Sequence, residues 1–165
     1  MMDKKIAVVI LNWNGAKLLE QFLPSVLSYS DEATIYVADN ASTDNSIQII
    51  KEQFSEVKII QNDGNYGFAQ GYNFALKNIV EPYYALVNSD IQVTKNWLTP
   101  ILSIFDNEPQ IGIIQPKILD YKDKEKFEYV DRTCTTQWLE RVKFLSNEIS
   151  KEQQKHSLLK ENSDY

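Results

Sequence analysis

Two acidic residues follow stretches of the chain that read as buried strands. Asp39 ends one apolar run, and Asp90 closes the polar triplet Asn88-Ser89-Asp90 after another. A carboxylate at a strand end can accept hydrogen bonds from the base or ribose of a nucleotide, which we favour for Asp39 over simple capping of the next turn. Asp90 can hold a divalent cation, because hard oxygen ligands suit Mg²⁺ or Mn²⁺. An Asx turn that closes the strand is the simpler alternative for the triplet.

A second group of residues lies where a helix is expected to begin. Gly67 and Gly71 stand within Asn65–Asn73, and a helix N-terminus without bulky side chains favours an anion such as a phosphate. The same glycines also suit tight packing of the helix on a sheet, and the two interpretations stay open. Trp13 is placed to stack on a base, although a lone aromatic residue more often packs at the rim of a core. The glycine fingerprint of dinucleotide-binding folds is absent after the first expected strand.

Alternating elements must position these residues. Short β-branched runs alternate with segments that carry an apolar stripe at helical spacing. The expected strands are 6–11, 33–38, 57–60, 83–87 and 111–114, and the expected helices follow from residues 16, 44, 68 and 94. This order predicts an α/β fold, a doubly wound and mostly parallel sheet with helices on both faces. Ligands of such sheets bind beyond the carboxyl ends of the strands, where the candidate residues lie.

Composition narrows the class of protein. The chain has 165 residues, 43% hydrophobic and 24% charged, which suits one folded domain. Its formal net charge of -6 argues against nucleic-acid binding. A single cysteine, Cys134, excludes an internal disulfide and favours a reducing compartment. The apolar start is too short for a signal peptide or a transmembrane segment, so we expect a cytoplasmic chain, peripheral at the inner face of the membrane if it contacts lipid at all.

Four motifs, in order, resemble those of family 2 glycosyltransferases, in particular the rhamnosyltransferase-type branch. They are Val8-Val9-Ile10-Leu11-Asn12-Trp13-Asn14-Gly15, Ala38-Asp39-Asn40-Ala41-Ser42-Thr43-Asp44-Asn45-Ser46, Asn65-Tyr66-Gly67-Phe68-Ala69-Gln70-Gly71-Tyr72-Asn73 and Leu86-Val87-Asn88-Ser89-Asp90. Each motif alone is weak, but four in the right order on the right elements are specific. The resemblance covers Ile6 to Leu119.

The resemblance implies a GT-A fold, a UDP- or dTDP-sugar donor, a saccharide or lipid-linked acceptor, and a divalent metal, Mg²⁺ or Mn²⁺. Such proteins serve cell-wall or polysaccharide biosynthesis. Asp90 would be the metal ligand, as the last residue of a DXD-like motif whose first acidic residue is replaced by Asn88. The residues implied to contact the nucleotide sugar are Leu11, Trp13, Asp39, Asn40, Ser42, Gly67, Phe68, Gly71, Asn73, Asn88 and Ser89.

The C-terminal part departs from the family pattern. Members that invert need a carboxylate base for the acceptor hydroxyl, and none is identifiable here, so the catalytic residue is unknown. We expect a nucleotide-sugar-binding domain over residues 1–120, a divergent helical segment and tail over 121–165, and a truncated or frameshifted chain. Self-association through the face from Trp138 to Ile149 is a further expectation. A non-catalytic nucleotide-binding or interaction module is the alternative function, and a nicotinamide-dependent oxidoreductase is a third.

Overall fold

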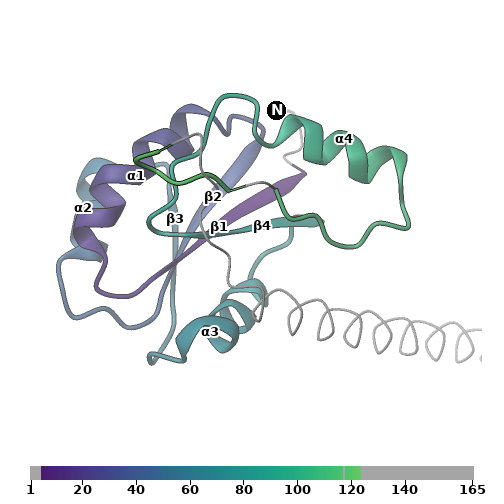
Figure 1. Ribbon diagram of the computed structural model, residues 1–165. Helices are drawn as coiled ribbons and strands as arrows, with labels where there is room; N and C mark the ends of the chain where they lie inside the picture. Colours follow the sequence, from purple (N-terminus) through teal and green to yellow (C-terminus); the bar gives the residue numbers. More distant parts are fainter. Residues whose placement is uncertain (1–4, 117, 124–165) are drawn as a thin grey trace, which may run out of the picture. The chain divides into compact units, whose positions relative to one another are not determined.

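The described part of the chain is an open parallel sheet flanked by helices. A computed structural model describes residues 5–116 and 118–123. The strands are β1 (Ile6–Asn12), β2 (Ala33–Asp39), β3 (Lys58–Gln61) and β4 (Tyr83–Asn88). The helices are α1 (Ala16–Ser28), α2 (Ser46–Gln53), α3 (Gly67–Leu76) and α4 (Thr99–Asn107). All strand pairs are parallel, in the order β3-β2-β1-β4 (Figure 1). The predicted parallel α/β fold is confirmed.

The sheet has an apolar layer on each face, which explains why its central strand is a continuous apolar run. Alternate residues of β1 belong to two different clusters: Ile6, Val8 and Ile10 pack with α1 and α2 residues, whereas Ala7 and Val9 pack with α3 residues. Figure 1 shows α1 and α2 on one side of the strands and α3 on the other. A strand covered on both sides buries apolar area at every position, worth about 25 cal/mol per Å². The expected strand at residues 6–11 is confirmed, one residue longer.

The described chain falls into two compact units, the first ending at Ile104 and the second beginning at Phe105. The four strands, α1, α2 and α3 all belong to the first unit. The boundary expected from sequence, 120/121, stays a prediction. All of the candidate site residues lie in the first unit, so the site can be described within it alone.

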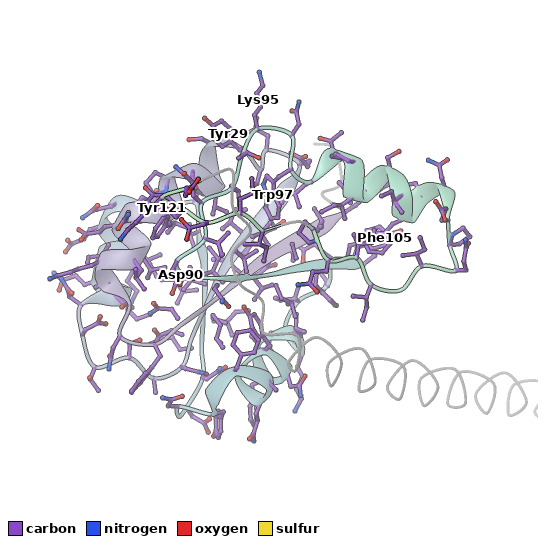
Figure 2. The ribbon with its side chains drawn as sticks, viewed as in Figure 1. Tyr29, Asp90, Lys95, Trp97, Phe105 and Tyr121 are labelled. Carbon is purple, nitrogen blue, oxygen red and sulfur yellow. The ribbon has the colours of Figure 1, made fainter. Side chains whose placement is uncertain are left out.

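Two expected elements differ from the structure. Residues 111–114 form no strand; the segment contains Gly112, which weakens a strand, and Ile113 is exposed. Thr94 does not begin the fourth helix, which starts at Thr99. Asn96 takes a left-handed backbone conformation, φ 61°, which interrupts any helix from Thr94. Trp97 still packs against the core and points toward the sheet, while Lys95 points away from it (Figure 2).

Several sequence-derived expectations fall outside the described residues. These are Cys134, the face from Trp138 to Ile149, and the C-terminal acidic residues Asp131, Glu140 and Glu148, which the sequence gives no reason to assign as the base. Among the described helices, none is long and apolar enough to cross a membrane.

Candidate functional site

The carboxyl ends of the strands bring the candidate residues to one edge of the sheet. Register pairs Asn12 with Asp39 across β1 and β2, and Leu11 with Asn88 across β1 and β4. The Asn40 backbone N–H donates to the Asn12 carbonyl over 2.8 Å, which extends the β1–β2 pairing into the loops. The motifs at the ends of β1, β2 and β4 are therefore neighbours, as the parallel topology predicts.

Asp39 is a buried carboxylate held by its own chain. It is 1% exposed. The Asn12 side-chain amide donates to Asp39 Oδ1 over 2.9 Å, and the Ser42 hydroxyl donates to the same oxygen. The Ser42 backbone N–H donates to Oδ2 over 2.9 Å. A carboxylate offers about four acceptor positions, so about one, on Oδ2, remains for a ligand donor. Asp39 thus closes its own turn, and its contact with a ligand stays a prediction.

A second set of hydrogen bonds ties the loop after β1 to the loop after β2. The Asn14 side-chain oxygen accepts from the Thr43 backbone N–H over 2.7 Å and from the Asp44 N–H over 3.3 Å. Asp44 accepts from the Ala16 N–H, at the start of α1, over 3.1 Å. Burial tends to raise the pKa of Asp44, but hydrogen bonds from Ser46 and Ala16 outweigh it and hold that pKa below its ordinary value. We call Asn14, Thr43 and Asp44 the loop brace.

Asn40, a predicted ligand residue, is engaged in holding α3. It is 2% exposed. Its Nδ2 donates to the Gly67 carbonyl over 2.9 Å, and its Oδ1 accepts from Asn62 Nδ2 over 2.7 Å. A Cβ atom on Gly71 would lie 2.7 Å from both polar atoms of the Asn40 amide. For Gly71 the structure therefore supports the tight-packing interpretation, and the ligand contacts of Asn40 and Gly71 stay predictions.

The start of α3 carries candidate residues that are open to solvent. Gly67 has φ +66°, and a Cβ there would meet nothing within 4 Å. Phe68 is 52% exposed and packs edge-on against Tyr72, with ring centroids 5.0 Å apart. Tyr72 anchors α3 on β4 through a 2.9 Å hydrogen bond from its hydroxyl to the Val87 carbonyl, and burial raises its pKa to about 12. Asn73 is exposed. Gly67, Phe68 and Asn73 remain available to a ligand.

The loop after β1 offers an exposed aromatic ring at the same edge. Trp13 is 57% exposed, so its face is free to stack on a planar ligand. Leu11, immediately before, is half-buried and packs against the core on the α3 side of the sheet. The expectation that both border a base is consistent with these positions and stays a prediction.

The loop after β4 supplies the predicted metal ligand. Asn88 and Asp90 are exposed and Ser89 is half-buried; Figure 2 marks Asp90 where β4 ends. The described residues contain no group of three or more His, Cys, Asp or Glu side chains that could hold a metal ion. A single exposed carboxylate fits a cation that also binds phosphate oxygens and water, as Mg²⁺ commonly does. It does not fit a site made of protein ligands alone.

Two buried asparagines were missed in the sequence analysis. Asn12 is 0% exposed and Asn62 is 9% exposed. Asn62 donates to Asn40 and to the Gly71 carbonyl. Asn12 is the last residue of β1, and Asn62 is the first residue after β3. Their position directly at the end of an apolar strand is the sequence signal that could have identified them.

Ala41 gives a test of backbone strain between Asn40 and Ser42. Its φ is 57°, a conformation that costs an L-residue roughly 1–2 kcal/mol, while glycine costs roughly 0.5–1 kcal/mol through its freedom when unfolded. We expect Ala41→Gly to raise the free energy of unfolding by about 0.5 kcal/mol in urea titrations. Ala69→Gly, on the exposed side of α3, should lower it by roughly 0.5–1 kcal/mol. Equal losses from both would contradict the assigned strain.

The described unit is thus a GT-A-like α/β domain with polar side chains gathered at the strand ends. The sequence profile of Glycosyl transferase family 2 matches residues 7–162, most of the chain and beyond Leu119, where the motif resemblance ends. The chain belongs to this family. The resemblance to family 2 glycosyltransferases, inferred from the four motifs, is confirmed.

Two curated relatives show the same family over part of their length. The chain is 23% identical over 131 residues to N-acetylglucosaminyl-diphospho-decaprenol L-rhamnosyltransferase of Mycobacterium tuberculosis, covering 72% of this chain and 43% of that protein. It is 24% identical over 117 residues to teichoic acid poly(glycerol phosphate) polymerase of Staphylococcus epidermidis, covering 68% and 16%. The chain therefore spans less than half the length of these relatives.

Solved structures show the same fold. TarS of S. aureus, residues 1–349, superposes with a TM-score of 0.56 at 25% identity, covering 64% of this chain and 33% of that TarS segment. The mannosyltransferase PcManGT from Pyrobaculum calidifontis, solved with GDP-Man and Mn²⁺, gives a TM-score of 0.56 at 18% identity, covering 69% and 33%.

Proposed function

We propose that this chain binds the nucleoside diphosphate part of a UDP- or dTDP-sugar, as the donor-binding portion of an inverting glycosyltransferase. The observation that carries the proposal is that the end of β2, with Asp39, and the end of β4, with the Asn88-Ser89-Asp90 loop, flank the end of β1. Asp39 keeps about one acceptor position for a base or ribose donor. Exposed Trp13 and Phe68 offer flat surface to the nucleoside.

The proposal includes a divalent cation, Mg²⁺ or Mn²⁺, held by Asp90 together with diphosphate oxygens. When bound, such a cation supplies positive charge that stabilises the charge developing on a leaving diphosphate. Asp90 is suited to this because its carboxylate is exposed and takes no hydrogen bond from the described residues. PcManGT, with GDP-Man and Mn²⁺, supports the pairing of a metal with a nucleotide sugar in this fold.

Several finer parts of the proposal concern the whole protein. TarS has been solved in complex with UDP-GlcNAc and with UDP, which supports a uridine-linked donor. The decaprenol-linked substrate in the name of the mycobacterial relative supports a lipid-linked acceptor. We place the chain in the cytoplasm, with contact at a membrane surface, and we keep homo-oligomerisation and the domain limits 1–120 and 121–165 within the proposal. The catalytic base stays unassigned.

Calorimetric titration of UDP, dTDP, GDP and NADH, each with and without Mn²⁺, tests the proposal. We expect Mn²⁺ to strengthen UDP or dTDP binding, and Asp90→Ala to lower the affinity measured with Mn²⁺ by about tenfold while leaving the metal-free affinity unchanged. The matched control is Asp31→Ala, which removes the same charge just before β2, at the opposite edge of the sheet.

Each other outcome favours a different function. A nucleotide affinity that is the same with and without Mn²⁺, and the same in Asp90→Ala, favours the non-catalytic binding module. Tight NADH binding favours an oxidoreductase. If none of the nucleotides binds, with or without Mn²⁺, the proposal is contradicted.

A further inference from the structure

Three side chains form a row across the sheet where the strands end. Asn12 is paired in register with Asp39 of β2. Residues paired in parallel strands point to the same face, so Asp39 and Asn12 both lie on the face that α1 and α2 cover. On the other side of β1, the register with β4 ends where Leu11 pairs with Asn88. Ser89 is the next residue, in the turn after β4, and it follows Val87, which packs on that same face.

The middle side chain of this row is satisfied at only one end. Asn12 Nδ2 donates to Asp39 Oδ1 over 2.9 Å and to Ser42 Oγ over 3.1 Å. Asn12 Oδ1 is buried and has no hydrogen-bond partner among the described residues. Rotating the amide by 180° would turn Oδ1 against the Asp39 carboxylate, so the charge on Asp39 fixes this orientation. The row thus contains one buried acceptor that lacks a donor, which is costly to keep.

The orphan acceptor faces the loop after β4. A Cβ atom on Gly15 would lie 2.4 Å from Asn12 Oδ1 and 3.7 Å from Ser89 Oγ. Both oxygens therefore lie beside the position that a Gly15 side chain would occupy, and such a side chain would clash with Asn12 Oδ1. The Ser89 hydroxyl, on a half-buried residue, carries the donor that Oδ1 lacks.

We propose that Asn12 is a positioning residue that couples the nucleoside end of the site to its diphosphate end. A bound nucleotide draws the loop after β4 inward, and the Ser89 hydroxyl then donates to Asn12 Oδ1, while Asn12 Nδ2 keeps Asp39 in place. The bond satisfies the orphan acceptor only in the loaded site, so it strengthens nucleotide binding. The inference rests on the proposed function, because it needs a nucleotide to bring the loop in.

A double-mutant cycle on UDP affinity, measured with Mn²⁺, tests the coupling. We expect Ser89→Ala to weaken UDP binding about fivefold in the wild-type background and not at all in the Asn12→Ala background. Ser89→Thr, which keeps the hydroxyl, should restore affinity to within about twofold. Ser89→Ala should leave the stability of the nucleotide-free chain unchanged, which separates coupling from a structural role.

A second measurement covers the case in which Asn12→Ala does not fold. The side-chain amide signal of Asn12, followed by ¹⁵N NMR, should shift more on adding UDP to the wild type and to Ser89→Thr than on adding UDP to Ser89→Ala, in which only the contact through Asp39 remains. Wild-type binding with additive substitutions, or with the same Asn12 shift in Ser89→Ala as in the wild type, overturns the coupling alone. A wild-type chain that binds no nucleotide overturns it together with the proposed function.

Discussion

Asp39→Ala is expected to lower the free energy of unfolding by about 3 kcal/mol. The substitution removes the acceptor for the Asn12 amide, for the Ser42 hydroxyl and for the Ser42 backbone N–H. Each buried donor left without a partner costs roughly 1–3 kcal/mol. The Asn12 amide keeps its existing hydrogen bond to the Ser42 hydroxyl, and Ser42 is only half-buried, which together keep the sum near the lower limit. Urea unfolding followed by circular dichroism measures the loss.

The control for this loss is an aspartate at the same edge of the sheet that is exposed. Asp63 follows β3 and, within the described part of the chain, accepts a single side-chain hydrogen bond, from the Tyr66 hydroxyl over 2.6 Å. Asp63→Ala should cost less than about 0.5 kcal/mol, since surface contacts contribute little. If Asp39→Ala lowered the free energy of unfolding as little as Asp63→Ala, the hydrogen bonds assigned to Asp39 would not contribute to stability as argued.

Gly71→Ala is expected to destabilise the protein by about 1–2 kcal/mol and to loosen the start of α3. The new Cβ would lie 2.7 Å from the Asn40 amide, which cannot turn aside because both of its ends are bonded, to Gly67 and to Asn62. Overpacking costs roughly 1–3 kcal/mol, and the better helix propensity of alanine returns up to about 1 kcal/mol. Thermal unfolding gives the net effect, and hydrogen exchange of α3 amides reports the loosening.

Gly64→Ala is the matched control for Gly71→Ala. The atoms nearest to a Cβ at Gly64 would belong to the Tyr66 side chain, at 3.5 Å or more, which is ordinary contact. We expect a change of less than about 0.5 kcal/mol. Adding Asn40→Ser to Gly71→Ala should make the double variant less destabilised than the sum of the two single changes, because the smaller side chain leaves room. Strict additivity would contradict a contact between residues 40 and 71.

The layered sheet could be predicted from the sequence because its signal is local and repeated. The run from Ile6 is apolar at every position, and such a run is favourable only where both faces are covered. The helix stripes alternate with these runs at spacings that suit parallel crossovers. The segment 111–114 shows where this reasoning fails. An apolar run predicts a strand only if another strand lies beside it, and the partner is not encoded in the run itself.

The location of the candidate site could be predicted from the sequence, but which of its side chains are buried and which are exposed could not. Strand ends predicted Asp39 and Asp90 at one edge of the sheet, and the register places Asp39 and Asn88, two residues before Asp90, at that edge. The sequence does not show that the Asn40 amide is hydrogen-bonded to the start of α3, or that the Trp13 ring is exposed. Asparagine is mostly a surface residue, so its type gave no hint that Asn12 would be buried. These outcomes depend on partners that lie 22 to 30 residues away.

The loop brace of Asn14, Thr43 and Asp44 bears on the thermodynamics of binding. It fixes the segments after β1 and β2 to each other in the absence of any nucleotide. A ligand seated on them meets backbone that is already ordered, so association there loses little conformational entropy, a loss that otherwise weakens binding. Recognition at this half of the site is accordingly expected to resemble lock-and-key fitting, with the adjustment on binding confined to the loop after β4.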